Sequence, residues 1–248
     1  EILDALARGR RDGATSLWLG GGEPTLRRDL FATASAPRRM GYTRIKLQTN
    51  GMLLAYPGYA RRCADAGVTE VAFAIKGATA ATHDAYTRTP GAHALLLDGV
   101  TAARDAGLAL EGDLLVYRGN AAEIPAMVAR YTPLGLAAYR VWLLSSTQGD
   151  VTEHVPRIAD VTPHLAAARA LGLSTRADFI TSLHTPACTL PEADHAMLFS
   201  AADLALRVSN PGGHEFLLES SPMEGGRYLE GCARCRHRPR CGGLRDDY

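Results

Sequence analysis

Short apolar stretches alternate with longer Ala-, Leu- and Arg-rich stretches over roughly the first 170 residues of the chain. The short stretches combine Val, Ile, Leu and aromatic residues, which is typical of buried strands, and they predict strands at residues 16–19, 44–49, 70–75, 110–117 and 139–144. In the longer stretches apolar residues recur with a spacing near 3.6, which predicts helices at residues 59–66, 92–106, 123–131 and 161–171. Strands and helices therefore alternate along this part of the chain.

A glycine stands between most predicted helices and the strand that follows, at Gly41, Gly67, Gly107, Gly135 and Gly172. Glycine readily adopts the left-handed conformation that ends a helix. Consecutive strand–helix units wind with a right-handed crossover into a parallel sheet. The predicted fold class is therefore α/β, a partial (β/α)6 TIM-like barrel, with a doubly wound sheet as the main alternative.

The texture of the sequence changes after about residue 174, where prolines and paired glycines become frequent. This change predicts two domains, a barrel at residues 1–173 and a small cysteine-rich α+β appendage at residues 174–248. Within the appendage, residues 204–208 and 214–218 are expected to form a hairpin around the sequence Asn-Pro-Gly-Gly.

Composition excludes several classes of protein. With 46% hydrophobic residues, the chain is expected to fold rather than stay disordered. Its net charge of only +1 provides no strong electrostatic attraction for nucleic acid or an anionic membrane. It contains no apolar run long enough for a membrane span and no signal-peptide pattern near residue 1, so a cytoplasmic protein is expected.

Two motifs follow the first two predicted strands. Because ligands bind at the carboxyl ends of parallel strands, residues at these positions carry functional information. The first motif, Gly20-Gly21-Gly22-Glu23-Pro24-Thr25, offers close backbone approach and an acceptor for an ammonium group, which would suit a small zwitterion. The second, Gln48-Thr49-Asn50-Gly51, is by itself an ordinary turn, and a bare glycine turn is the alternative for the first.

Taken together, GGGEPTLRRDL and LQTNG resemble the radical S-adenosylmethionine (SAM) superfamily. The resemblance continues in residues 74–77, with His83, Asp84, Arg88 and Gly91 beyond them. It implies an enzyme that receives an electron from a reductant such as a flavodoxin or ferredoxin and cleaves SAM to a 5'-deoxyadenosyl radical. That radical would abstract hydrogen from a peptide or another small biosynthetic substrate.

The resemblance also implies a SAM site. Gly20, Gly21, Gly22 and Glu23 would bind the methionyl amino group, Thr49 and Asn50 would lie near polar groups of SAM, and Arg118 would pair with its carboxylate. An exposed rim charge is the alternative for Arg118. No catalytic residue is assigned, although the barrel interior offers candidates for substrate contact, namely Glu111, Asp113, Tyr117, Trp142 and Ser145.

The sequence departs from the family pattern in two respects. Ala74 and Lys76 stand where the family has serine and aspartate. The C-x3-C-x2-C loop that holds the SAM-cleaving [4Fe-4S] cluster is missing, since no cysteine precedes Cys63, which is expected to fill the core. We expect a natural chain that extends beyond Glu1 with the first strand and this loop, so that the sequence as given is inactive. The alternatives are a non-catalytic, radical SAM-like binding protein with a metal-stabilised tail, and a zinc-stabilised α/β hydrolase or transferase unrelated to SAM.

Four cysteines gather in the C-terminal part, at Cys188, Cys232, Cys235 and Cys241. Their C-x2-C and C-x5-C spacing suits an iron–sulfur cluster or a structural zinc, for which His237 is a possible replacement ligand. The pattern is similar to the SPASM or twitch appendages of radical SAM enzymes, which implies an auxiliary [4Fe-4S] cluster held by these four cysteines.

Overall fold

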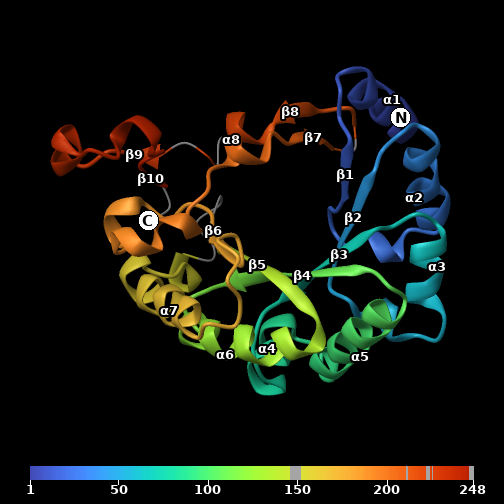
Figure 1. Cartoon of the computed structure of the whole chain (residues 1–248), viewed down its shortest axis with the longest axis horizontal. Helices are drawn as coiled ribbons and strands as arrows, with labels where there is room; N and C mark the ends of the chain where they lie inside the picture. Colours follow the sequence, from blue (N-terminus) through green and yellow to red (C-terminus); the bar gives the residue numbers. More distant parts are fainter. Residues whose placement is uncertain (146–151, 211, 222–223, 225, 246–248) are drawn as a thin grey trace. The chain divides into compact units, whose positions relative to one another are not determined.

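The computed structural model describes residues 1–145, 152–210, 212–221, 224 and 226–245 (Figure 1). One sheet contains six parallel strands in the order of the sequence: β1 (Ser16–Leu19), β2 (Arg44–Thr49), β3 (Glu70–Ile75), β4 (Ala109–Val116), β5 (Leu136–Leu143) and β6 (Ile180–Ser182). The sequential order confirms the α/β partial barrel and excludes the doubly wound alternative, in which the order reverses. Strand β6, which has three residues, is too short to be predicted from its pattern.

Eight helices accompany these strands in the described part of the chain: α1 (Ile2–Arg11), α2 (Leu30–Arg39), α3 (Tyr59–Asp65), α4 (Ala80–Thr87), α5 (Ala92–Asp105), α6 (Ile124–Tyr131), α7 (Ile158–Ala170) and α8 (Ala201–Leu204). The four helices predicted by periodicity are confirmed as α3, α5, α6 and α7. All five predicted stop glycines have a positive φ, between 64° and 109°. No helix of the described residues is long and apolar enough to cross a bilayer.

The chain divides into two compact units, which are described separately below. The first comprises residues 1–113 and 130–138, and the second comprises residues 114–129 and 139–248. The boundary between the units reflects how densely the residues contact one another, and it falls within strands β4 and β5. The functional boundary near residue 174 stays a prediction.

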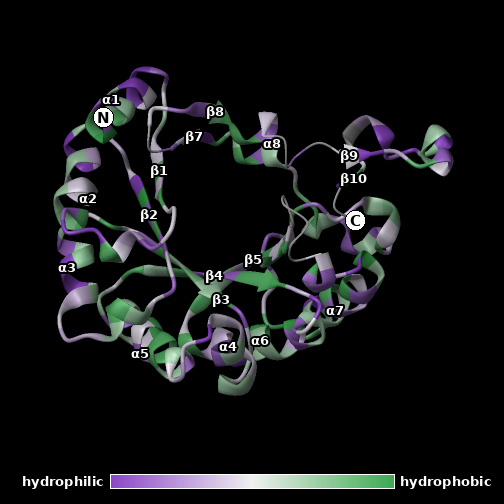
Figure 2. Ribbon diagram, turned by 180° about the vertical axis from the view of Figure 1, so that it is seen from behind, coloured by the Kyte–Doolittle hydropathy of each residue, from purple (hydrophilic) through white to green (hydrophobic). Residues whose placement is uncertain are grey.

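In the first unit the strands have one apolar face and one polar face. Ile45, Leu47, Val71 and Phe73 are fully buried, and their side chains share one face because strand residues alternate. Helices α1, α2 and α3 lie on one side of β1–β3 in Figure 1 and in the reverse view of Figure 2. The opposite face, called here the polar face, carries Trp18, Lys46, Gln48, Glu111 and Asp113. A polar face is unusual in a barrel, whose interior is normally filled by branched apolar residues.

The second unit contains two antiparallel pairs besides its part of the main sheet. Strand β7 (Arg207–Ser209) pairs with β8 (Glu215–Leu217), which confirms the predicted hairpin with shorter strands; Pro211 of its turn lies outside the described residues. Strand β9 (Gly226–Arg227) pairs with β10 (Leu244–Arg245). This second pair closes the segment 228–243, called here the cysteine loop, at its base.

Candidate functional site

The Glu23 carboxylate joins the turns that follow β1 and β2. Its Oε1 accepts hydrogen bonds from the Thr25 N–H (3.0 Å), the Thr25 hydroxyl (2.6 Å) and the Thr49 hydroxyl (2.6 Å). Its Oε2 accepts from the Asn50 N–H at 2.8 Å. Glu23, Thr49 and Asn50, which the sequence predicts as site residues 26 or 27 positions apart, therefore meet at one point.

Further hydrogen bonds hold these two turns. The Asn50 side-chain oxygen accepts from the Met52 N–H at 2.9 Å, and the Tyr59 hydroxyl donates to the Thr25 carbonyl at 2.8 Å. Hydrogen bonds to a charged group contribute about 1.5–3 kcal/mol each. The Glu23 network thus fixes the backbone at the ends of both strands before any ligand binds.

Gly20, Gly21 and Gly22, called here the glycine shelf, lead into Glu23 and are exposed. Gly21 has φ 116°, a conformation that favours glycine. A Cβ added to Gly21 or Gly22 would meet no atom within 4 Å, whereas one added to Gly20 would lie 3.0 Å from the Gln48 Oε1. The space in front of Gly21 and Gly22 is therefore open, and the backbone of the glycine shelf is accessible to a ligand.

Two polar bridges cross the polar face from β2 to β4. Lys46 Nζ lies 2.6 Å from Glu111 Oε2, and the Gln48 amide donates to Asp113 Oδ2 at 2.6 Å. Strand β3 lies between β2 and β4 and presents Ala72 to this face, and by alternation Ala74 as well. Ala72, the register partner of Gln48, has a small side chain that leaves room for the Gln48–Asp113 bridge. The sequence analysis named Glu111 and Asp113 but missed their partners, because pairing across an intervening strand leaves no local signal.

Lys76, the second departure from the family pattern, is half-buried at the end of β3. Burial lowers the pKa of its ammonium group, while the charges of Glu23 and Asp113 act in the opposite direction. A cation therefore stands near the carboxylates of the Glu23 network and the polar face.

Two buried histidines support the backbone at Lys76, and the sequence analysis missed this role. His83 Nδ1 accepts a hydrogen bond from the Lys76 N–H at 3.3 Å, and its ring centroid lies 5.7 Å from that of His93. Burial, reinforced by the charges of Lys76 and His93, lowers the pKa of His83 to about 4. His83 is therefore neutral at pH 7, which leaves Nδ1 able to accept. Burial lowers the pKa of His93 as well.

Arg118 belongs to the second unit and is exposed. Its backbone N–H donates to the His154 carbonyl at 2.9 Å, and its Nη2 donates to the Val155 carbonyl at 3.3 Å. A guanidinium has five N–H donors, so these contacts orient the side chain without using all of its donors. Its pairing with the SAM carboxylate stays a prediction.

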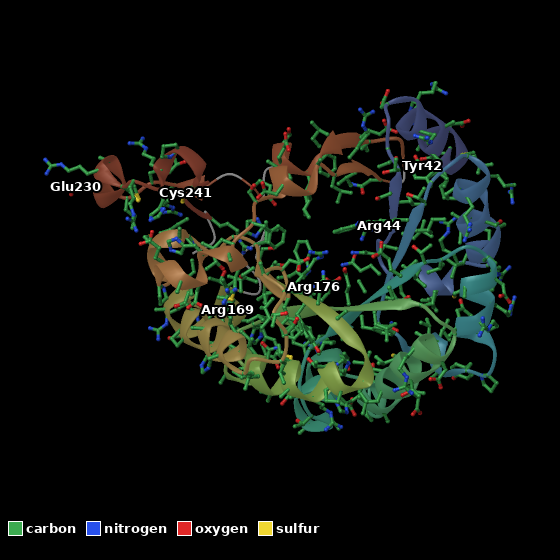
Figure 3. All side chains as sticks on the ribbon, viewed as in Figure 1. Tyr42, Arg44, Arg169, Arg176, Glu230 and Cys241 are labelled. Carbon is green, nitrogen blue, oxygen red and sulfur yellow. The ribbon has the colours of Figure 1, made fainter. Side chains whose placement is uncertain are left out.

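The second unit also contains the four predicted metal ligands, on short turns. Cys188 lies in a 3-10 turn, and Cys232, Cys235 and Cys241 lie in the cysteine loop, where Figure 3 labels Cys241. Burial raises the pKa of the Cys188 thiol, and Cys235, Cys241 and Cys232 raise it further. The thiols of the cysteine loop are thus close enough to affect that of Cys188. Among the described residues, however, no three His, Cys, Asp or Glu side chains are arranged as metal ligands.

Several contacts join the turn of Cys188 to the cysteine loop. His195 Nε2 donates to the Ala187 carbonyl at 2.9 Å, and its ring packs edge-on against His237 at 5.1 Å between centroids. Arg236 pairs with Glu192 at 3.1 Å and donates through Nε to His237 Nε2 at 3.1 Å. Within the loop, the Gly243 N–H donates to Cys241 Sγ at 3.4 Å. These contacts connect the turn of Cys188 with the cysteine loop, and thiols are the donors that iron–sulfur clusters use.

Cys63 differs from the other cysteines. It is fully buried on α3, and burial raises the pKa of its thiol to about 11. Such a thiol is inert and fills the core, which confirms the sequence prediction. Cys63 therefore offers no accessible thiolate as a metal ligand.

Comparison with known proteins agrees with these motifs. A protein-family model of the Radical SAM superfamily matches residues 1–128. An AdoMet-dependent heme synthase of Methanosarcina barkeri is 35% identical over 144 residues, which are 58% of this chain and 41% of that protein. A GTP 3',8-cyclase of Erythrobacter litoralis is 36% identical over 132 residues, 52% of this chain and 39% of that protein. The chain spans about two fifths of the length of these relatives.

Solved structures share the fold at low sequence identity. Streptococcus suis SuiB superposes with a TM-score of 0.56 and 14% identity, covering 68% of this chain and 39% of that chain. Native anSMEcpe with bound AdoMet and Cp18Cys peptide gives a TM-score of 0.55 and 15% identity, covering 68% of this chain and 50% of that chain. With the matched family model extending over more than half of its residues, this chain belongs to the radical SAM superfamily.

Proposed function

We propose that residues 1–248 form the SAM-binding barrel and the auxiliary-cluster region of an enzyme that cleaves SAM reductively and abstracts hydrogen from its substrate. The observation that carries this proposal is the exposed glycine shelf, fixed by the Glu23 network at the ends of β1 and β2. A preformed, glycine-lined backbone at strand ends suits a ligand that must be held in one orientation.

In this proposal each part of the chain has a separate task. The backbone of the glycine shelf binds the methionyl amino group, and Arg118 pairs with the carboxylate, since a guanidinium matches a carboxylate and keeps its charge. The Glu23 network and the His83 contact to Lys76 hold the strand ends in place. The polar face offers carboxylate groups that orient a polar substrate.

The iron–sulfur chemistry is assigned to two places. When bound, a [4Fe-4S] cluster supplies the electron that cleaves SAM to methionine and a 5'-deoxyadenosyl radical. Cys63 is not assigned to this cluster, because its side chain is fully buried in the core. Cys188, Cys232, Cys235 and Cys241 hold an auxiliary [4Fe-4S] cluster in the domain of residues 174–248. A structural zinc is the alternative for these thiols.

The proposed substrate is a peptide or another small biosynthetic precursor. A solved structure that shares this fold is titled as SuiB bound to the precursor peptide SuiA, and the matched relatives are named heme synthase and GTP 3',8-cyclase. The proposal includes a flavodoxin or ferredoxin as reductant. It takes the enzyme to be cytoplasmic, because reduced thiols and clusters need a reducing compartment.

The test is product analysis with the full-length natural protein, purified without oxygen and supplied with iron, sulfide, SAM and dithionite. We expect methionine and 5'-deoxyadenosine in equal amounts, measured by liquid chromatography and mass spectrometry. SAM that binds but stays intact would favour a non-catalytic binding protein. A natural sequence without any C-x3-C-x2-C motif would contradict the enzymatic proposal.

A further inference from the structure

The amino group of SAM on the glycine shelf needs hydrogen-bond acceptors, and the Glu23 carboxylate is largely used by the protein. Its Oε1 accepts three hydrogen bonds, and its Oε2 accepts a fourth. A carboxylate has about four lone-pair positions in total. Glu23 therefore serves mainly to fix the backbone, and a second side-chain acceptor beside the shelf would complete the site.

Gln48 provides such an acceptor next to Gly20. Its amide nitrogen donates to Asp113 Oδ2 at 2.6 Å, and because an ionised carboxylate only accepts, this contact fixes which end of the amide is nitrogen. The oxygen Oε1 is then at the other end, 3.0 Å from the position of a Cβ added to Gly20. Among the described residues, no protein donor is bonded to this oxygen.

The Gln48–Asp113 bridge is well placed to keep this orientation. Asp113 is 2% exposed, so its carboxylate is not free to follow solvent, while Gln48 is half-buried and within reach of a ligand. Turning the amide over would bring Oε1 against the carboxylate and repel it. The orientation of the acceptor is therefore set by a buried charge on β4.

We infer that Gln48 Oε1, oriented by Asp113, accepts a hydrogen bond from the methionyl amino group of SAM. This inference rests on the proposed function, since it assigns a residue to the proposed SAM site. Gln48 is then a binding residue, and Asp113 is a positioning residue that acts through Gln48. The absence of a side chain at Gly20 is what allows the acceptor to lie against the shelf.

The test compares two ligands by equilibrium dialysis with the anaerobically reconstituted full-length protein. One ligand is SAM, and the other is an analogue in which hydrogen replaces the methionyl amino group. Gln48→Met keeps the length of the side chain but removes the acceptor. We expect this variant to bind SAM about tenfold more weakly and to bind the analogue as the wild type does.

Further variants separate orientation from packing. Asp113→Leu is expected to weaken SAM binding when it is introduced into the wild-type protein. It should add no further loss when introduced into Gln48→Met, because both substitutions remove the same interaction. In the double variant Gln48→Glu with Asp113→Asn, the side chain at position 113 becomes the donor and the one at position 48 the acceptor. This variant is expected to keep the preference for SAM over the analogue. The matched control, Lys46→Met with Glu111→Leu, removes the other bridge and should leave the ratio of the two affinities unchanged.

The outcomes distinguish the inference from the proposed function. A wild-type protein that binds neither ligand contradicts the proposed SAM site, and the inference falls with it. If the wild type binds SAM and Gln48→Met binds it with the same affinity, the inference about Gln48 is wrong, while the proposed SAM site stands. Equal losses for SAM and the analogue also overturn it, because Gln48 would then act through packing. If the Lys46–Glu111 control changes the ratio as much as Gln48→Met, the assignment to Gln48 is wrong.

Discussion

The glycine shelf and the cysteine loop, the two regions proposed to bind cofactors, are held in different ways. At the shelf, Glu23 bonds to three residues of two turns, and the strand ends are fixed without a ligand. The cysteine loop is closed by a two-residue pair of strands, and its thiols do not form a metal-binding arrangement in the described residues. The comparison indicates that the proposed SAM site is held by the protein's own hydrogen bonds, whereas the proposed auxiliary site would be completed by the metal.

Removing one ligand of the auxiliary cluster should give the largest effect. In the full-length anaerobic protein, Cys235→Ser is expected to lower the iron content from about eight to about four per chain, as for the loss of one four-iron cluster. Iron and acid-labile sulfide assays measure this change. Cys63→Ala is the matched control, and it should keep all the iron while losing stability because it leaves a cavity in the core. One zinc per chain without sulfide would contradict the auxiliary cluster.

Loss of the Glu23 charge should disturb the glycine shelf and the turns that the Glu23 network holds. Glu23→Gln is expected to lower the free energy of unfolding by about 2–4 kcal/mol and to weaken SAM binding about a hundredfold, because an amide nitrogen would face the donors of Thr25 and Thr49. Urea unfolding and equilibrium dialysis measure the two effects. Glu192→Gln, which breaks only the exposed pair with Arg236, should change stability by less than about 0.5 kcal/mol. Similar behaviour of the two variants would show that the Glu23 network is not structural.

Acid should also weaken the support that His83 gives to the backbone at Lys76. Folding lowers the pKa of His83 from 6.5 to about 4, so between these pH values the unfolded chain binds a proton that the folded chain does not. The free energy of unfolding should therefore be full above pH 6.5 and fall by about 3 kcal/mol as the pH drops toward 4. Urea midpoints across this range measure the slope, which should be shallower in His83→Gln. An identical slope in the variant would rule out His83 as its source.

The sequence predicts the regular parts of this molecule because each strand and helix is encoded locally. The apolar residues within 70–75 and the stop glycine Gly67 are examples, and both match the structure. Glu23, Thr49 and Asn50 could be named because two motifs end neighbouring strands. The contacts of Gln48 with Asp113 and of His83 with Lys76 could not be named, because they depend on side-chain directions in three dimensions.

The most direct test of the central claim is the SAM affinity of Gly22→Ala, measured together with its stability. Because an added Cβ at Gly22 meets no protein atom, the variant should keep its stability within about 1 kcal/mol, while the methyl group occupies the space proposed for SAM. Gly231→Ala is the control, since a Cβ there also meets no atom but the residue lies in the cysteine loop. We predict that Gly22→Ala binds SAM at least about tenfold more weakly and that Gly231→Ala binds it normally. Unchanged SAM affinity in a folded Gly22→Ala protein would contradict the account.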